Sequence, residues 1–171
     1  MHTTEKPYIE FLDGELHRKV TPKRTHAIVQ GAMLRILYAC AGHRGSVGTE
    51  WDFRLGVVDE THTVLVPDVA FVTRERLQAL SKRDREEPPF SPDVVVEVRS
   101  PSNDARYRER KITRYLATGA IAVLDVDPPS RTITVHEQGL SRVFGEQERL
   151  ESLALPWLSF DVAKAFEDLE D

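Results

Sequence analysis

Two acidic residues interrupt apolar stretches that have the composition of buried strands. Asp68 lies in VLVPDVAFV (64–72), and Glu97 lies in VVVEV (94–98). A carboxylate among apolar side chains loses hydration, so it needs a proton, a metal or another cation as partner. Two carboxylates, water and a substrate phosphate can hold Mg²⁺, and the ion can lower the pKa of bound water. With Lys111 following, the pattern predicts a phosphate-processing metal site.

Side-chain alternation places the proposed ligand Glu97 on one face of its strand, together with Val95 and Arg99. In the predicted helix that follows, Lys111 lies at the edge of the apolar face marked by Ile112. Its long stem can cross the sheet and bring the ammonium group to Glu97. We therefore expect Lys111 to position or activate the attacking water.

Each of these residues also has a purely structural interpretation. Pro-Asp pairs such as the one ending at Asp68 are common at turns, and Glu97 could be neutralised by Arg99 or Lys111. The combination of two strand acids and a lysine is more specific than its parts. Both interpretations stay open at this point.

A local basic segment stands out in a chain whose formal net charge is −5. The segment 99–114 holds six basic and two acidic residues, so its surface could follow phosphates, although a solvated helix face explains it equally well. We expect Arg99 or Arg106 to bind phosphate. His26, near a helix start, is a weaker candidate for contacting phosphate or lining the site, against the alternative of a surface histidine.

Composition narrows the class of protein. The 171 residues are 40% hydrophobic and 30% charged, as in an ordinary single-domain protein. The single cysteine, Cys40, excludes an internal disulfide and a CxxC zinc site. The start MHTTEKPY lacks a signal-peptide pattern, and no stretch reaches the length of a membrane span, so we expect a cytoplasmic protein without membrane contact.

The hydrophobic patterns predict one α/β domain over 1–171, with a mixed β-sheet flanked by helices. Its parts are an N-terminal hairpin and helix (1–42), a core (48–137) and a C-terminal strand and helix (142–171). The hairpin turns at Asp13-Gly14, and the helix is expected to start with Thr21 as N-cap and end at Gly42. The other expected elements are strands at 48–55, 63–66, 69–72, 94–98, 121–126 and 132–136, helices at 77–80, 104–118 and 160–169, and an exposed loop at 81–89.

A family resemblance rests on four blocks: DGEL (13–16), VPDVAFV (66–72), SPDVVVEVRSPSNDARYRERKITRYLATGA (91–120) and VLDVDPPSRTITVHE (123–137). They resemble the Uma-two family of endonucleases in the PD-(D/E)XK nuclease superfamily. The resemblance implies a restriction-endonuclease-like core that binds Mg²⁺ or Mn²⁺. It implies that Asp68 and Glu97 are the metal ligands and that Lys111 is a catalytic lysine moved from the strand to the next helix.

The sequence departs from the superfamily pattern at Arg99, where a lysine usually follows the acid by two residues. Arginine stabilises phosphate charge but is a poor general base, since it stays protonated. One hypothesis is therefore a metal-dependent DNA endonuclease, and by resemblance a homodimer. The alternative is a catalytically degenerate relative that binds DNA, in which Arg99 neutralises Glu97 in place of the metal, or a protein-interaction module that uses the C-terminal helix.

Overall fold

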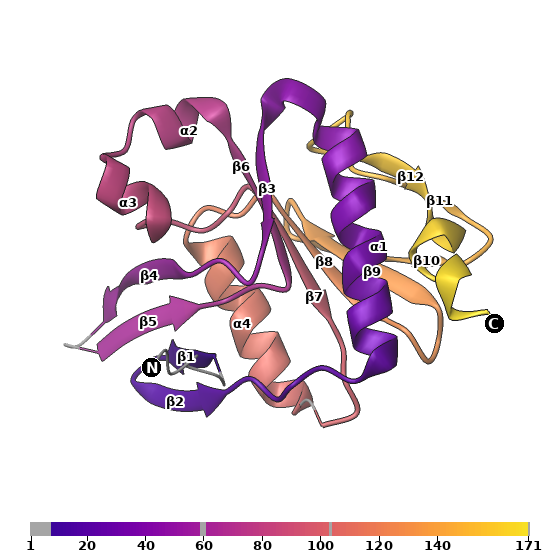
Figure 1. The fold of residues 1–171 in the computed structure, drawn as a ribbon, viewed down its shortest axis with the longest axis horizontal. Coiled ribbons are helices and arrows are strands. Elements are labelled where there is room, and N and C mark those ends of the chain that lie inside the picture. The colour runs from indigo at the N-terminus through magenta and orange to yellow at the C-terminus, as the bar shows by residue number, and fades with distance from the viewer. Residues whose placement is uncertain (1–7, 59–60, 103, 171) are drawn as a thin grey trace, which may run out of the picture.

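The computed structural model describes residues 8–58, 61–102 and 104–170, and a six-stranded mixed sheet forms its centre (Figure 1). The strand order is β10-β9-β8-β7-β6-β3. β7 and β8 are parallel, whereas the other neighbouring pairs are antiparallel. The strands are β3 (Gly45–Thr49), β6 (Val69–Thr73), β7 (Val94–Val98), β8 (Ala122–Asp127), β9 (Thr132–Glu137) and β10 (Leu140–Gly145).

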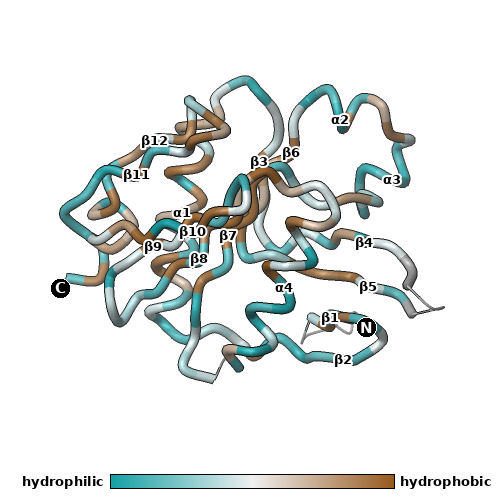
Figure 2. The backbone as a smooth tube through the Cα atoms, turned by 180° about the vertical axis from the view of Figure 1, so that it is seen from behind, coloured by the Kyte–Doolittle hydropathy of each residue, from teal (hydrophilic) through white to brown (hydrophobic). Residues whose placement is uncertain are grey.

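Helices cover both faces of this sheet, as the nearly continuous valine run of β7 predicts. On one face α1 (Arg24–Ala41) packs on a core that includes Val94, Val96 and Val98. On the other face Val95 packs with residues of α4 (Ala105–Ala117), the helix that connects β7 to its parallel neighbour β8. Figure 2 shows the hydrophobic segments gathered in central strands such as β6 and β7, whereas β2 is hydrophilic.

A second sheet, of order β2-β1-β5-β4, lies beside α4 (Figure 1). Its strands are β1 (Ile9–Leu12), β2 (Glu15–Arg18), β4 (Phe53–Val58) and β5 (Thr61–Leu65). Leu12, Phe53 and Leu65 form one core cluster with Tyr115 of α4. The predicted hairpin is confirmed by the antiparallel pairing of β1 and β2 around its two-residue turn.

The predicted strand at 48–55 is wrong, because the chain changes sheets within it. Glu50 has a φ of 51°, a backbone conformation that ends β3, and β4 starts at Phe53 in the other sheet. β4 and β5 pair in antiparallel orientation, and residues 59–60 between them lie outside the described part.

The first helix starts later than predicted. Its N-cap is Lys23 and not Thr21, and among the described residues no side-chain hydrogen bond caps this end. Residues 19–23 instead form an irregular connector between β2 and α1. The helix continues to Ala41, with Gly42 at a φ of 56° as its C-cap.

The segment between β6 and β7 contains more helix than predicted. The short helix predicted at 77–80 is α2 (Arg74–Gln78), and the expected loop contains α3 (Lys82–Glu86), whose N-cap Ser81 accepts a hydrogen bond from Asp84 N–H. The charged residues of this segment indicated a loop, but they form a short helix with a capped N-terminus. Most residues of this segment are exposed, as expected.

The C-terminal tail is not the predicted amphipathic α-helix. It contains β12 (Ser159–Asp161), which pairs with β11 (Arg149–Glu151), and two 3₁₀ helices, η2 (Val162–Ala165) and η3 (Glu167–Leu169). Val162 and Phe166 are fully buried in the core cluster that contains α1 residues. The tail thus docks on its own domain through these buried side chains.

A third short 3₁₀ helix, η1 (Gly42–Arg44), links α1 to β3. None of the described helices has the length and apolar character needed to cross a membrane.

Candidate active site

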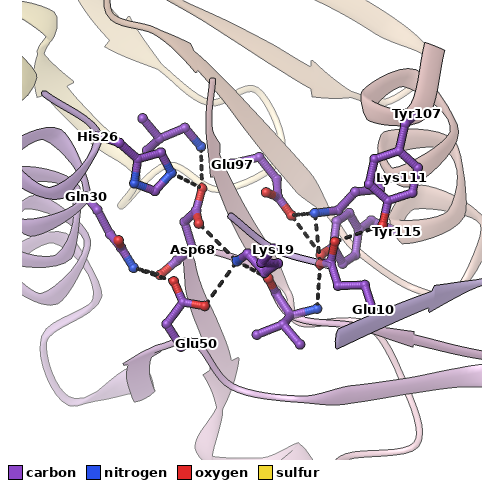
Figure 3. A network of polar contacts seen from close by, with 12 residues as sticks. Glu10, Lys19, His26, Gln30, Glu50, Asp68, Glu97, Tyr107, Lys111 and Tyr115 are labelled. Atoms are coloured by element: carbon purple, nitrogen blue, oxygen red, sulfur yellow. Dashed lines mark hydrogen bonds and ion pairs between the residues drawn. The ribbon is translucent and has the colours of Figure 1, made fainter. Parts of the chain in front are cut away.

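Strand pairing brings the two predicted acids together. β6 and β7 are antiparallel with Val69 opposite Val96, so Asp68 follows the same register to lie opposite Glu97. Both residues are buried, at 2% and 7% exposure. The β6–β7 pairing therefore turns two positions distant in sequence into one acidic pair, drawn in Figure 3.

Asp68 is held by donors from three directions. One oxygen, Oδ2, accepts the backbone N–H of Val98 at 2.7 Å and lies 3.2 Å from His26 Nε2. The other oxygen, Oδ1, accepts from Lys19 Nζ at 3.1 Å. Burial opposes ionisation, but the charge of Lys19 and the hydrogen bonds hold the pKa of Asp68 well below its ordinary value. Asp68 is therefore ionised at neutral pH.

Glu97 receives its donors on a single oxygen. Lys111 Nζ lies 2.7 Å from Oε1, and Tyr115 donates its hydroxyl to the same atom at 2.9 Å. Among the described residues, none donates to Oε2. Burial, helped by the negative charge of Asp68 and opposed by Lys111, raises the pKa of Glu97 to about 7. Glu97 is the acid in this pair whose charge changes near neutral pH.

Lys111 projects from α4 and lies between two acids. Its contact with Glu97 was predicted from the sequence, whereas its contact with Glu10 was not. Its Nζ is 2.9 Å from Glu10 Oε1 and 2.7 Å from Glu97 Oε1. Glu10 is fixed in turn by the backbone N–H of Val66 and the hydroxyl of Tyr107. Burial disfavours the charged lysine, but the two carboxylates raise the pKa of Lys111 above its ordinary value. The lysine is therefore protonated.

Sequence reasoning missed the second lysine of the site, Lys19. Its Nζ donates to Glu50 Oε2 at 3.0 Å, to the backbone oxygen of Val66 at 2.7 Å and to Asp68 Oδ1 at 3.1 Å. Gln30 of α1 adds hydrogen bonds to Glu50 and to the backbone oxygen of Asp68. Despite burial, the charges of Asp68 and neighbouring acids raise the pKa of Lys19.

The sequence contains a weak indication that Glu10, which the sequence analysis did not select, is buried. Glu10 alternates with Ile9 and Phe11 in β1 and shares a face with the buried Leu12, so strand periodicity alone places it inside. Lys19 and Glu50 lie in irregular segments, where no periodicity indicates a direction.

The charge balance of the network fits a divalent cation. Four carboxylates, those of Glu10, Glu50, Asp68 and Glu97, face two ammonium groups. With all four ionised and His26 neutral the excess is two negative charges, and this state is reached only above the pKa of Glu97, about 7. Burial opposes protonation of His26, but its hydrogen bond with Asp68 raises its pKa, so a protonated His26 lowers the excess. Oxygen donors are the ligands that Mg²⁺ and Mn²⁺ prefer. Within the described residues no three acidic, histidine or cysteine side chains already converge as metal ligands. Asp68 Oδ1 and Glu97 Oε2 are the candidate ligands.

Comparisons with known proteins identify the family. The model of the Uma2 family, whose description reads "Putative restriction endonuclease", matches residues 1–163. The chain belongs to the Uma2 family. Among curated proteins, none matches it.

The Uma2 chain is also similar to a solved structure, described as a "putative nuclease belonging to DUF820" from Anabaena variabilis ATCC 29413. The TM-score is 0.81 at 18% identity, over 94% of this chain and 90% of the other. At this identity the similarity shows the fold alone. It confirms the predicted α/β architecture with a mixed sheet flanked by helices.

Arg99 does not neutralise Glu97 in this Uma2 chain, so that part of the degenerate-nuclease alternative is wrong. Its guanidinium group binds Asp125 at 2.9 and 2.6 Å and Asp127 at 3.3 Å. β8 runs parallel to β7 with Asp125 opposite Glu97, and the arginine reaches this neighbouring strand. Its guanidinium group is thus already engaged by two carboxylates.

A pocket of about 220 Å³ opens over the acidic pair of the Uma2 site. Its lining includes the predicted residues His26, Asp68, Glu97 and Lys111, and Arg108 adds a cation that sequence reasoning did not single out. The predicted phosphate ligand Arg106 is exposed on the first turn of α4 and does not line this pocket.

A second cavity, of about 610 Å³, adjoins this pocket. The two share Val20, His26, Ser100, Ser102 and Arg108 in their linings. Proline side chains contribute further apolar surface to the second cavity; they are Pro22, Pro101, Pro128 and Pro129. The site therefore continues into a larger, less polar groove.

Proposed function

We propose that this protein is a metal-dependent endonuclease that hydrolyses phosphodiester bonds of DNA. The observation that carries the proposal is the buried pair of Asp68 and Glu97, brought together by the β6–β7 pairing in one pocket, with four carboxylates against two lysines around it. Membership of the Uma2 family, whose description names restriction endonucleases, supports the same reaction class.

The metal would be Mg²⁺ or Mn²⁺, held by Asp68 Oδ1 and Glu97 Oε2. When bound, such an ion lowers the pKa of a coordinated water and offsets charge on the scissile phosphate. The hydrogen bonds of Lys111 and Tyr115 fix Glu97 Oε1, which leaves Oε2 to act as ligand. Asp68 is ionised already in the free protein because its donors lower its pKa.

Lys111 would orient the attacking water and stabilise negative charge on the phosphate. Its raised pKa keeps the ammonium protonated, so it does not accept the proton from water. Arg108, which lines both the catalytic pocket and the adjoining cavity, would contact a neighbouring phosphate. The adjoining cavity would then hold the nucleotide next to the scissile bond.

We further propose a homodimer, because cutting both strands of a duplex requires two sites. Sedimentation of the purified protein with and without duplex DNA tests this. A monomer under both conditions contradicts the dimer but leaves cleavage of single strands possible.

The decisive experiment is cleavage of supercoiled plasmid and of a labelled single strand in Mg²⁺, Mn²⁺ or EDTA. We expect metal-dependent cleavage that falls by about a hundredfold or more in Glu97→Gln, since a ligand of the ion is lost. Glu151→Gln, which removes an exposed acid on β11, is the matched control and should cleave like the wild type. Equal cleavage by Glu97→Gln and wild type would reject the assignment.

A DNA-binding protein without catalysis is the second candidate. One observation favours it: ammonium groups, those of Lys19 and Lys111, already lie against the carboxylates proposed as ligands. This candidate predicts no heat of Mn²⁺ binding that depends on Glu97. Titration of wild type and Glu97→Gln with Mn²⁺ by calorimetry separates the two functions.

A further inference from the structure

We propose that, in the metal-free protein, Lys19 holds the Asp68 oxygen that the divalent cation would use, and that the ion binds by exchanging with the ammonium group at this oxygen. The inference rests on the proposed function, in that it takes Asp68 and Glu97 as the ligands. It assigns a positively charged residue, Lys19, to an otherwise acidic metal site. It also explains how this acidic cluster folds without its ion.

The contacts of Lys19 have the composition of a hard-cation site. Its ammonium group lies within 3.1 Å of three oxygens, from the carboxylates of Glu50 and Asp68 and the backbone carbonyl of Val66. Carboxylate and carbonyl oxygens are the usual ligands of Mg²⁺ and Mn²⁺. In Figure 3 Lys19 lies between Asp68 and Glu10, and Lys111 lies on the side of Glu97.

Both cations cannot use Asp68 Oδ1 at the same time. Mg²⁺ binds an oxygen at about 2.1 Å, and an ammonium group donating to the same atom would lie within a few ångströms of the ion. The repulsion between two close cations in a buried site is large. Because Asp68 Oδ2 is held by Val98 N–H and His26, the ion has to take Oδ1 from Lys19.

Lys19 and Lys111 differ in how easily their ammonium groups can move away from the carboxylates. Lys111 is anchored in the middle of α4 and lies between two acids. Lys19 belongs to the irregular connector at 19–23, and it lines the open pocket above the acids. Its side chain therefore has both a flexible stem and space into which the ammonium group can withdraw.

Lys19 also provides a physical reason why the free protein tolerates the site. Without it, Asp68 and Glu50 would lose a cationic partner while largely buried, with side-chain exposures of only 2% and 22%. The consequence is that an incoming ion has to displace a favourable interaction, which weakens its apparent affinity.

Calorimetric titration with Mn²⁺, without DNA, tests the exchange on wild type, Lys19→Met and Lys19→Gln. We expect Lys19→Met to bind Mn²⁺ about tenfold tighter or more, because no ammonium group competes. Lys19→Gln, which keeps a neutral donor, should lie between them. Lys23→Met removes an exposed lysine from the same connector and should bind like the wild type, which controls for net charge.

A second readout is the melting temperature in EDTA and in Mn²⁺. In EDTA, Lys19→Met should have a lower melting temperature than the wild type. Addition of Mn²⁺ should raise the melting temperature of Lys19→Met by more than that of the wild type. If Lys19→Met folds only with Mn²⁺ present, Lys19→Gln supplies the affinity comparison.

The outcomes separate this inference from the proposed function. If wild type binds Mn²⁺ through Glu97 but both Lys19 variants bind it equally or more weakly, the exchange is overturned and the metal site stands. If neither the wild type nor any Lys19 variant binds Mn²⁺, both the metal site and the exchange are overturned.

Discussion

The two halves of the site contain the same pair of groups, a buried carboxylate and a lysine, yet the carboxylates behave in opposite ways. Asp68 lies 3.1 Å from Lys19, and Glu97 lies even closer, 2.7 Å, to Lys111. The pKa of Asp68 is lowered, whereas the pKa of Glu97 is raised to about 7. Proximity of a lysine therefore does not decide whether a buried acid is ionised.

The difference lies in the remaining donors. Asp68 uses both oxygens, with a backbone N–H and His26 on one and Lys19 on the other. Glu97 has its two donors on one oxygen, and its lysine is shared with Glu10. A buried carboxylate stays charged when several donors are directed at it. Asp68 is thus a fixed negative charge, whereas the charge of Glu97 changes with pH near neutrality.

The largest difference in stability is expected when Asp68 and Glu97 are each replaced by the neutral amide. Asp68→Asn should lower the free energy of unfolding by about 3 kcal/mol at slightly alkaline pH in EDTA, because the largely buried Lys19 loses the more deeply buried of its two acidic partners. Glu97→Gln should cost less than about 1 kcal/mol, because it removes an acid that is unfavourably ionised there. Urea unfolding measures both, and equal losses would contradict the asymmetry.

The pH dependence of stability gives the next largest effect. Between the pKa of an unfolded glutamate, about 4.3, and the value of about 7 in the fold, the folded protein holds the extra proton on Glu97. Stability contributed by Glu97 is therefore present at low pH and is lost as pH rises through this window. Asp68 has the opposite sign, since its lowered pKa contributes stability that is lost only in acid.

We expect the wild type to lose about 2 kcal/mol relative to Glu97→Gln between about pH 5 and about pH 8. Urea unfolding of both proteins at several pH values in EDTA checks this. A difference that stays constant with pH would show that Glu97 does not titrate in this range.

The smallest effect is expected from single hydroxyl groups. Tyr115→Phe removes the neutral donor to Glu97 and should cost about 1 kcal/mol while raising the pKa of Glu97 further. Tyr107→Phe is the matched control, because it removes a hydroxyl donor to Glu10 instead. Midpoints of the pH-dependent unfolding should move upward only for Tyr115→Phe. A similar shift in both variants would argue for a general change in the network.

Part of the site could be predicted because it depends on local pattern. The apolar runs around Asp68 and Glu97 identified two buried strands, and helical spacing placed Lys111 at the edge of a packed face. The irregular positions gave no such pattern, so Lys19 and Glu50 were missed. Arg99 was assigned to the wrong acid because sequence neighbours suggest partners, whereas the parallel strand β8 supplies the nearer carboxylates.

The sequence by itself determined which segments are apolar, how their side chains alternate and where α1 and α4 end, because these depend on residues close together in the chain. It therefore sufficed for the mixed sheet, the flanking helices and the two strand acids. Only the tertiary structure decided that β3 and β4 belong to different sheets, that Lys19 reaches Asp68, and that Glu97 carries the higher pKa. These properties arise from donors and charges on distant segments, and packing alone brings those segments together.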